Sequence, residues 1–237
     1  MLGFVLPRRA GGLVLGTQRG LATFDPQDDR LDVFARPEAD RPRNRFNDGR
    51  CDPCGRLWAG TMDVDCAAGA GRLYRVGADR SVQRMLDGLS ISNGLCWSSD
   101  GSTFYFIDSA ARRVDAFDLD AVAGTIACRR PAVRVDASLG FPDGMTIDEE
   151  GMLWVAHWGG GAVRRWDPRA GRLLASIDVP ATHVSSCCFG GPRLGDLYIT
   201  TAWSGLTGQQ RRDQPLAGSL FVARPGVRGQ PPVAFAG

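Results

Sequence analysis

Short apolar stretches separated by glycine-containing turns run along the whole sequence. Within these stretches, apolar residues alternate with polar ones or form brief runs, which is typical of β-strands that are buried on one or both faces. No segment shows the repeated spacing of three and four residues that marks a long amphipathic helix. The pattern therefore predicts an all-β protein built from short strands and many turns.

One unit of this pattern, a glycine-containing turn followed by an apolar strand, recurs five times. Its marker glycines are separated by 43, 46, 50 and 44 residues, and they are Gly12, Gly55, Gly101, Gly151 and Gly195. A further strand that ends in an Asp-Pro or glycine turn follows each unit. A period in the forties made of strands and turns is the signature of a β-propeller with about four strands per blade. We therefore expect residues 1–237 to form a single β-propeller domain.

Aromatic residues recur at the same phase of this repeat, at Trp58, Phe104, Trp154 and Tyr198. A blade cannot bury both of its faces alone, so blades must stack on one another around an axis. These aromatic side chains are predicted to pack between neighbouring blades.

The amino-acid composition limits the kinds of molecule that the protein is expected to bind. The formal net charge is only +2, which gives no reason to expect a nucleic acid or a membrane as partner. No apolar run approaches the roughly 18 residues of a membrane span, and the stretch MLGFVLPRRAGG lacks the layout of a signal peptide. We expect a soluble, cytoplasmic protein.

Three Asn-Gly or Asp-Gly pairs lie just upstream of marker glycines: Asp48-Gly49, Asn93-Gly94 and Asp143-Gly144. Because the repeats are related by rotation, Asn93 and Asp143 should face one another across the mouth of the central channel. Carboxylate and carboxamide oxygens suit a hard divalent cation, which would also compensate a carboxylate kept away from water. The same pairs are common in ordinary turns, so a metal site and plain turns are both open interpretations.

Other catalytic motifs are scarce. The sequence has no G-x-S-x-G elbow, phosphate-binding loop or dinucleotide fingerprint, and neither His157 nor His183 lies in a metal-ligand or nucleophile motif. His157 is interpreted as a packing or rim residue. Arg45, two residues before Asn47, either reaches into the channel to bind a polar ligand or is a solvated arginine of the basic stretch RPRNRF.

Several longer stretches carry a family resemblance: RFNDGRCDPCGRLWAGTM, ISNGLCWSSDGSTFYFIDS, PDGMTIDEEGMLWVA, SSCCFGG and GVRGQPPVAFAG. In this order, and over almost the whole chain, they resemble the gluconolactonase/regucalcin family, also called the senescence marker protein family. The resemblance implies a six-bladed β-propeller that binds one divalent metal ion, Ca²⁺, Zn²⁺, Mn²⁺ or Mg²⁺, and hydrolyses sugar lactones. Relative to that family, most of the first blade is expected to be absent, so about five blades are expected.

The resemblance also implies roles for individual residues. Matched position by position, Asn93 and Asp143 are metal ligands, and Asp143 is in addition the catalytic proton acceptor. Arg45, Asn47 and Asp65 are substrate-binding residues, with Asp65 the loosest match. The family's remaining metal ligand is a glutamate in an early strand of the blade that this chain is expected to lack.

These observations lead to one main hypothesis and two rivals. The main hypothesis is metal-dependent hydrolysis of a sugar lactone, similar to gluconolactone, to its aldonic acid. The first rival is a propeller that binds a metal or a small ligand without turnover. The second is an organophosphate or aryl-ester hydrolase with a metal in the channel, against which Arg45 and Asn47 argue.

Overall fold

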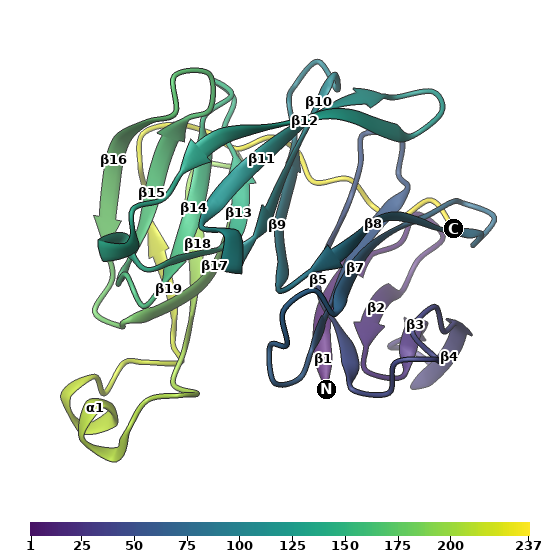
Figure 1. Ribbon diagram of the computed structural model, residues 1–237, viewed down its shortest axis with the longest axis horizontal. Coiled ribbons are helices and arrows are strands. Elements are labelled where there is room, and N and C mark those ends of the chain that lie inside the picture. The colour runs from purple at the N-terminus through teal and green to yellow at the C-terminus, as the bar shows by residue number, and fades with distance from the viewer.

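The computed structural model describes residues 1–237 and consists almost entirely of antiparallel strands (Figure 1). The strands are β1 (Leu2–Pro7), β2 (Leu13–Thr17), β3 (Gly20–Asp25), β4 (Arg30–Ala35), β5 (Asn44–Cys51), β6 (Leu57–Asp63), β7 (Gly71–Val76), β8 (Val82–Leu89), β9 (Ser92–Trp97), β10 (Thr103–Asp108), β11 (Arg113–Asp120), β12 (Thr125–Arg134), β13 (Phe141–Ile147), β14 (Leu153–Trp158), β15 (Ala162–Asp167), β16 (Arg172–Asp178), β17 (His183–Gly190), β18 (Asp196–Ala202) and β19 (Leu220–Ala223). The helical elements are two single turns, η1 (Ser109–Ala111) and η2 (Ala137–Leu139), and the short helix α1 (Gly208–Asp213).

Consecutive strands pair into five antiparallel units. β1–β4, β5–β8, β9–β12 and β13–β16 each form a four-stranded meander, and β17–β19 form a three-stranded one. A single pairing between Trp158 and His183 joins the last two units into one seven-stranded sheet. The predicted all-β class with four-stranded, propeller-like sheets is confirmed, whereas the number of blades in the ring stays a prediction.

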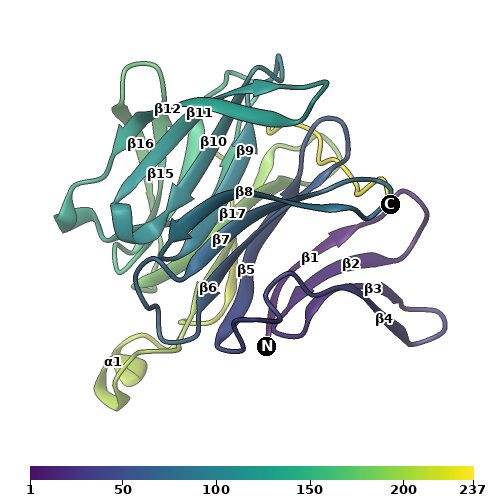
Figure 2. The same ribbon diagram turned by 45° about the vertical axis from the view of Figure 1, so that its right-hand side comes forward.

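The first strand of each unit lies innermost, and β1, β5, β9, β13 and β17 follow one another around a common axis. All five inner strands run in the same direction. They begin on the face where the N-terminus and α1 lie, and they end on the opposite face, which the last residues of the chain cross (Figure 1, Figure 2). The set of inner strands therefore has two distinct ends, or mouths.

Apolar side chains fill the spaces between consecutive units. Four buried clusters each combine residues of two neighbouring units. Trp58 and Phe104 lie together in the cluster between the second and third units, and Trp154 lies between the fourth and fifth. The predicted packing of these aromatics between units is confirmed, while Tyr198 is only half-buried.

The recurring glycine turns also hold the tryptophans that follow them. The Asp52 carboxylate accepts hydrogen bonds from the backbone N–H groups of its own turn and, at 3.1 Å, from the indole Nε1 of Trp58. Asp148 repeats this arrangement 96 residues later in the fold's fourth unit, where it accepts from Trp154 Nε1 at 2.9 Å. Each turn thus satisfies the one polar atom of a side chain that otherwise packs in the core.

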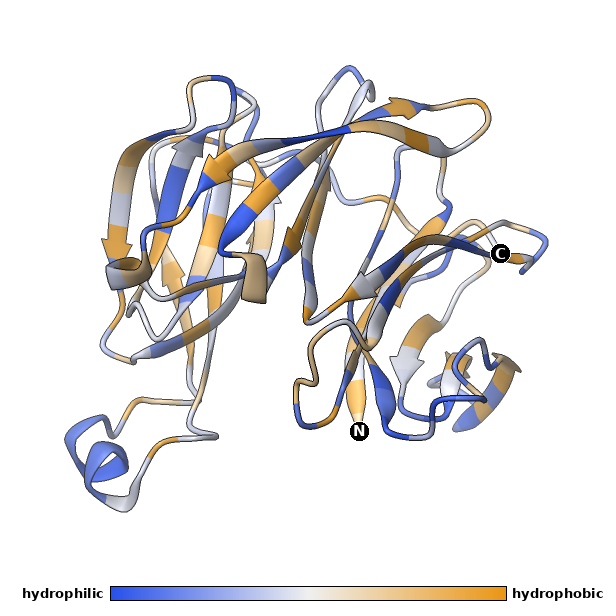
Figure 3. Cartoon of the chain, viewed as in Figure 1, coloured by the Kyte–Doolittle hydropathy of each residue, from blue (hydrophilic) through white to orange (hydrophobic).

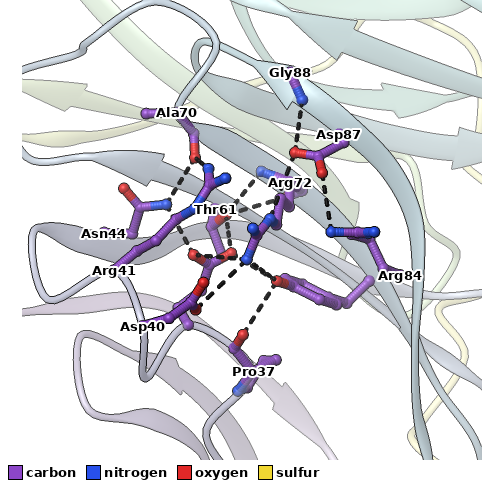
Figure 4. Close-up of polar contacts among 12 residues, drawn as sticks. Pro37, Asp40, Arg41, Asn44, Thr61, Ala70, Arg72, Arg84, Asp87 and Gly88 are labelled. Atoms are coloured by element: carbon purple, nitrogen blue, oxygen red, sulfur yellow. Dashed lines mark hydrogen bonds and ion pairs between the residues drawn. The ribbon is translucent and has the colours of Figure 1, made fainter.

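A polar network joins the first unit to the second at the connection between β4 and β5. The Glu38 carboxylate accepts hydrogen bonds from Asn44 Nδ2, Thr61 Oγ1 and Tyr74 Oη at 2.9, 3.0 and 2.8 Å. Figure 4 shows Arg72 at the centre of these contacts; its Nη1 lies 3.8 Å from Glu38 and 3.6 Å from Asp40. The connection is therefore fixed by buried, mutually satisfied polar groups.

The hydropathy of the residues agrees with this arrangement of strands. In Figure 3, apolar positions recur along the strands, and α1 is hydrophilic throughout. No helix of the protein has the length and apolar character needed to cross a bilayer.

Candidate functional site

All five inner strands carry an irregularity at the same level. In β5, Asn47 and Asp48 together oppose a single residue of β6, and in β13 the pair Asp143 and Gly144 opposes a single residue of β14. β1, β9 and β17 each carry one extra residue at the corresponding place: Gly3, Gly94 and Ser185. A bulge redirects the side chains beside it. The repeated bulges therefore create a ring of redirected side chains near the mouth where the inner strands begin.

Glycine is required in this ring because neighbouring inner strands approach closely. A Cβ atom at Gly144 would lie 2.2 Å from Ser186 Oγ on β17, and one at Gly94 would lie 2.7 Å from Met145 Cβ on β13. Either contact is far inside van der Waals distance. The Asn-Gly and Asp-Gly pairs of the sequence are thus strand bulges rather than ordinary hairpin turns.

Asn93 is buried on β9, and its orientation is set by Ser109. The Asn93 Nδ2 group donates to Ser109 Oγ at 2.9 Å, and Ser109 Oγ donates to the carbonyl oxygen of Pro142 at 2.6 Å. Because the amide nitrogen is engaged in this way, the Asn93 Oδ1 oxygen is left as a free acceptor. The same serine also holds the backbone just before Asp143.

Asp143 lies among protein atoms on most sides and keeps only part of its surface accessible. Burial raises the pKa of its carboxyl well above the ordinary value, and the nearby Asp48 carboxylate acts in the same direction. The Asn93 amide, the Gly144 N–H and the Arg45 guanidinium lower it in part. Burial likewise raises the pKa of Asp48, whose carboxylate accepts a hydrogen bond from Gly49 N at 2.8 Å.

Arg45 and Asn47 lie on β5 at the same mouth. Arg45 Nη1 donates to Asn47 Oδ1 at 2.7 Å, and Asn47 Nδ2 donates to the carbonyl oxygen of Ser92 on β9 at 2.9 Å. Burial lowers the pKa of Arg45, which lies close enough to Asp143 to interact with its charge. The Arg45 guanidinium forms no ion pair with a carboxylate. Its N–H groups other than those of Nη1 therefore remain available to a ligand.

The other expected substrate residue, Asp65, lies apart from this group. It is on the loop between β6 and β7, exposed to solvent, and it forms an ion pair with Arg43. No contact joins Asp65 to Arg45, Asn93 or Asp143. The structure thus brings together four of the five expected site residues and leaves the assignment of Asp65 as a prediction.

Two residues of this site were not assigned from the sequence. Asp48 shares the Asp-Gly signature of Asp143, and this signature was the signal that could have identified it. Ser109 had no such signal, because its role depends on the position of η1 relative to β9 and β13. His157, expected as a packing or rim residue, is fully buried; its Nδ1 contacts the Leu139 carbonyl oxygen at 3.0 Å.

The residues present fit a hard divalent cation. The Asp48 and Asp143 carboxylates lie close enough for their charges to interact, and the Asn93 carboxamide lies within hydrogen-bonding reach of Asp143. Like charges in such a place repel one another, and a cation would relieve both the repulsion and the cost of burial. Oxygen donors of this kind suit Ca²⁺, Mg²⁺ or Mn²⁺. No group of three or more His, Cys, Asp or Glu side chains offers an alternative metal cluster.

A family model for the SMP-30/gluconolactonase/LRE-like region matches residues 1–203. The chain belongs to this family. The predicted family is therefore confirmed, and the SMP-30/gluconolactonase/LRE-like family includes gluconolactonases.

Individual members of the family are similar over nearly the whole chain. Regucalcin of Danio rerio is 42% identical over 240 residues, covering 100% of this chain and 81% of the relative. A solved structure described as a calcium-binding protein, regucalcin, from Agrobacterium tumefaciens has a TM-score of 0.93 at 32% identity and covers 99% of this chain and 79% of its own. A gluconolactonase from Xanthomonas campestris has a TM-score of 0.70 at 25% identity, covering 84% of this chain and 68% of its own.

Proposed function

We propose that this protein hydrolyses a sugar lactone to its aldonic acid at the channel mouth formed by Asp143, Asp48, Asn93 and Arg45. The proposal rests on the gathering of two interacting carboxylates and a carboxamide beside a guanidinium, where the inner strands begin. Membership of a family that includes gluconolactonases supports the choice of reaction.

Asp143 is the proposed proton acceptor. The oxygen of a water molecule bonds to the lactone carbonyl carbon while Asp143 takes one of its protons. The bond between that carbon and the ring oxygen then breaks, and the ring oxygen leaves as a hydroxyl group after receiving the proton that Asp143 had taken. A general base must lie within hydrogen-bonding reach of the proton that it takes, and a partly buried carboxylate at the proposed site can meet this requirement.

Asp143, Asp48 and Asn93 Oδ1 would hold the divalent cation. When bound, such an ion would polarise the lactone carbonyl and stabilise negative charge on its oxygen. Ser109 keeps the Asn93 oxygen available by engaging the amide nitrogen. The description of the Agrobacterium regucalcin as calcium-binding supports the choice of a cation of this kind.

Arg45 and Asn47 would bind the sugar. Their mutual hydrogen bond fixes both side chains before substrate arrives, so little conformational freedom is lost on binding. The uncommitted N–H groups of Arg45 can donate to hydroxyl oxygens. We also propose that Asp65 contacts a more distant hydroxyl from the rim, where it would have to leave Arg43.

The test is proton release from D-glucono-δ-lactone above the uncatalysed rate. The purified protein is first freed of metal and then assayed with Ca²⁺, Mg²⁺, Mn²⁺ or Zn²⁺. Asp143→Asn should lower kcat by about a thousandfold with unchanged circular dichroism, whereas Asp28→Asn, at an exposed turn, should behave like the wild type. Metal binding without turnover by the folded wild type would instead support a binding protein. Turnover of paraoxon-type esters but not lactones would support the esterase alternative.

A further inference from the structure

The second mouth of the channel, opposite the proposed active site, holds a cavity of about 300 Å³. Its wall is built from the last residues of all five inner strands, including Pro7, Arg50, Trp97, Ile147 and Phe189. Residues 230–233, which belong to the C-terminal segment crossing this face in Figure 1 and Figure 2, form the remaining side. Because every inner strand contributes, the cavity lies on the axis of the molecule.

Arg50 supplies a fixed positive charge to this cavity. Its Nη1 donates to the backbone carbonyl oxygens of Leu95 on β9 and Met145 on β13, at 3.1 and 3.0 Å. Its Nη2 makes one long contact of 3.4 Å with Thr146 Oγ1. These bonds hold the guanidinium in place, yet no carboxylate pairs with it and its Nε–H has no acceptor. The cation is therefore half-buried and has no carboxylate among its hydrogen-bonding partners, although its charge reaches Asp48, two residues earlier on β5.

The rest of the cavity wall is mostly apolar. Aliphatic and aromatic residues, cysteines and prolines together make up most of it, with Thr146 and Gln230 as the other polar side chains, and no aspartate or glutamate lines it. Trp97 is itself buried and its indole Nε1 has no hydrogen-bond partner. Ligand sites commonly combine such apolar walls with a few fixed polar groups. A polyhydroxylated sugar or its acid would find too few partners here.

We propose that this axial cavity binds a small organic anion, a monocarboxylate with an apolar body about the size of one ring. The carboxylate would pair with Arg50, because a guanidinium fork matches two carboxylate oxygens, and the body would pack on Trp97 and Phe189. The site is separate from the proposed lactone site, since it opens at the other end of the channel.

Benzoate is the probe, and the emission of the protein's tryptophans is the readout. Titration of the metal-free wild type should give a saturable change in emission, and calorimetry should report the same affinity. Benzamide, a neutral molecule of the same shape, should bind at least about tenfold more weakly. Trp97→Phe should lose most of the emission change while calorimetry still detects binding.

Two variants test the proposed site, one by removing its charge and one by filling its space. Arg50→Gln should weaken benzoate binding at least about tenfold. Because Arg50 also connects β9 to β13 through its hydrogen bonds, a second variant leaves those bonds intact. Cys188→Phe, at an exposed position in the cavity wall, should block binding by filling space. Asp143→Asn should leave benzoate binding unchanged, which locates the ligand away from the lactone site. Absence of saturable binding up to 10 mM benzoate would overturn the proposal, as would equal binding of benzamide or full binding by Cys188→Phe.

Discussion

Asp48 and Asp143 direct their carboxylates into the same poorly hydrated space, although they lie on strands β5 and β13, which are separated by β9. Each is placed there by a bulge in its inner strand, and the charge of Asp48 raises the pKa of Asp143. The pair therefore concentrates negative charge that the Asn93 amide, the Gly144 N–H and Arg45 offset only in part. Its most direct consequence concerns cation binding.

Replacement of Asp48 by Asn should weaken Ca²⁺ binding by about tenfold or more, because affinity depends on the number of charged ligands. The same change removes a like charge from the neighbourhood of Asp143 and should lower the pKa of that carboxyl. Isothermal titration calorimetry with Ca²⁺ measures the first effect, with Asp28→Asn as the matched control. Equal affinities of Asp48→Asn and wild type would show that Asp48 does not hold the cation.

Ser109→Ala should reduce both activity and stability. It releases the Asn93 amide and the Pro142 carbonyl together, so the free energy of unfolding should fall by about 1–3 kcal/mol. We expect kcat/KM to fall about tenfold and Ca²⁺ affinity to fall as well, which a merely structural role would not require. Ser138→Ala, at an exposed serine of η2, is the control. Unchanged Ca²⁺ affinity in a destabilised Ser109→Ala protein would limit Ser109 to a structural role.

Much of the fold and of this site could be predicted from the sequence because the signals are local or repeated. Glycine turns and apolar runs predict the strands, and the repeat interval between Asn93 and Asp143 predicts that they face one channel. Asp48 carries the same Asp-Gly signal but was not assigned. Neighbouring residues of a regular strand point to opposite faces, and the bulge that directs Asn47 and Asp48 to one mouth has no local signal of its own. The orientation of Asp65 depends on its partner Arg43, which no local pattern reveals.

His157 should make the protein's stability sensitive to mild acid. Burial lowers the pKa of His157 from 6.5 to about 4. Above pH 6.5 the residue is neutral in both the folded and unfolded states, whereas between pH 6.5 and about 4 the unfolded state binds the proton first, so stability falls. This contribution amounts to about 3 kcal/mol. Urea unfolding of wild type and His157→Asn at pH 7 and pH 4 measures it: the loss on acidification should be smaller in the variant, and equal losses would contradict the assignment.

Glu38→Ala should destabilise the junction between the first and second units. The change removes the acceptor shared by Asn44, Thr61 and Tyr74, while Arg72 keeps Asp40 and Asp87 as ion-pair partners. Loss of a buried hydrogen-bonding partner costs about 1–3 kcal/mol. Asp40→Ala removes a second, exposed partner of the same Arg72 and should cost less than about 1 kcal/mol. Chemical denaturation of both variants gives the comparison, and similar losses would mean that the buried network adds nothing beyond a surface ion pair.

The bulges of the inner strands divide their residues into two groups: those whose side chains face a ligand at the mouth, and those that pack in the core. Side chains at Asn47, Asp48, Asn93, Asp143 and Ser185 sit beside interruptions of the pairing, while the regular residues on either side retain the contacts of the core. Substitution at these few positions would exchange the chemical groups displayed at the mouth without altering strand register. The same scaffold can therefore acquire a new ligand preference through changes at single sites, with the apolar interfaces between units left as they are.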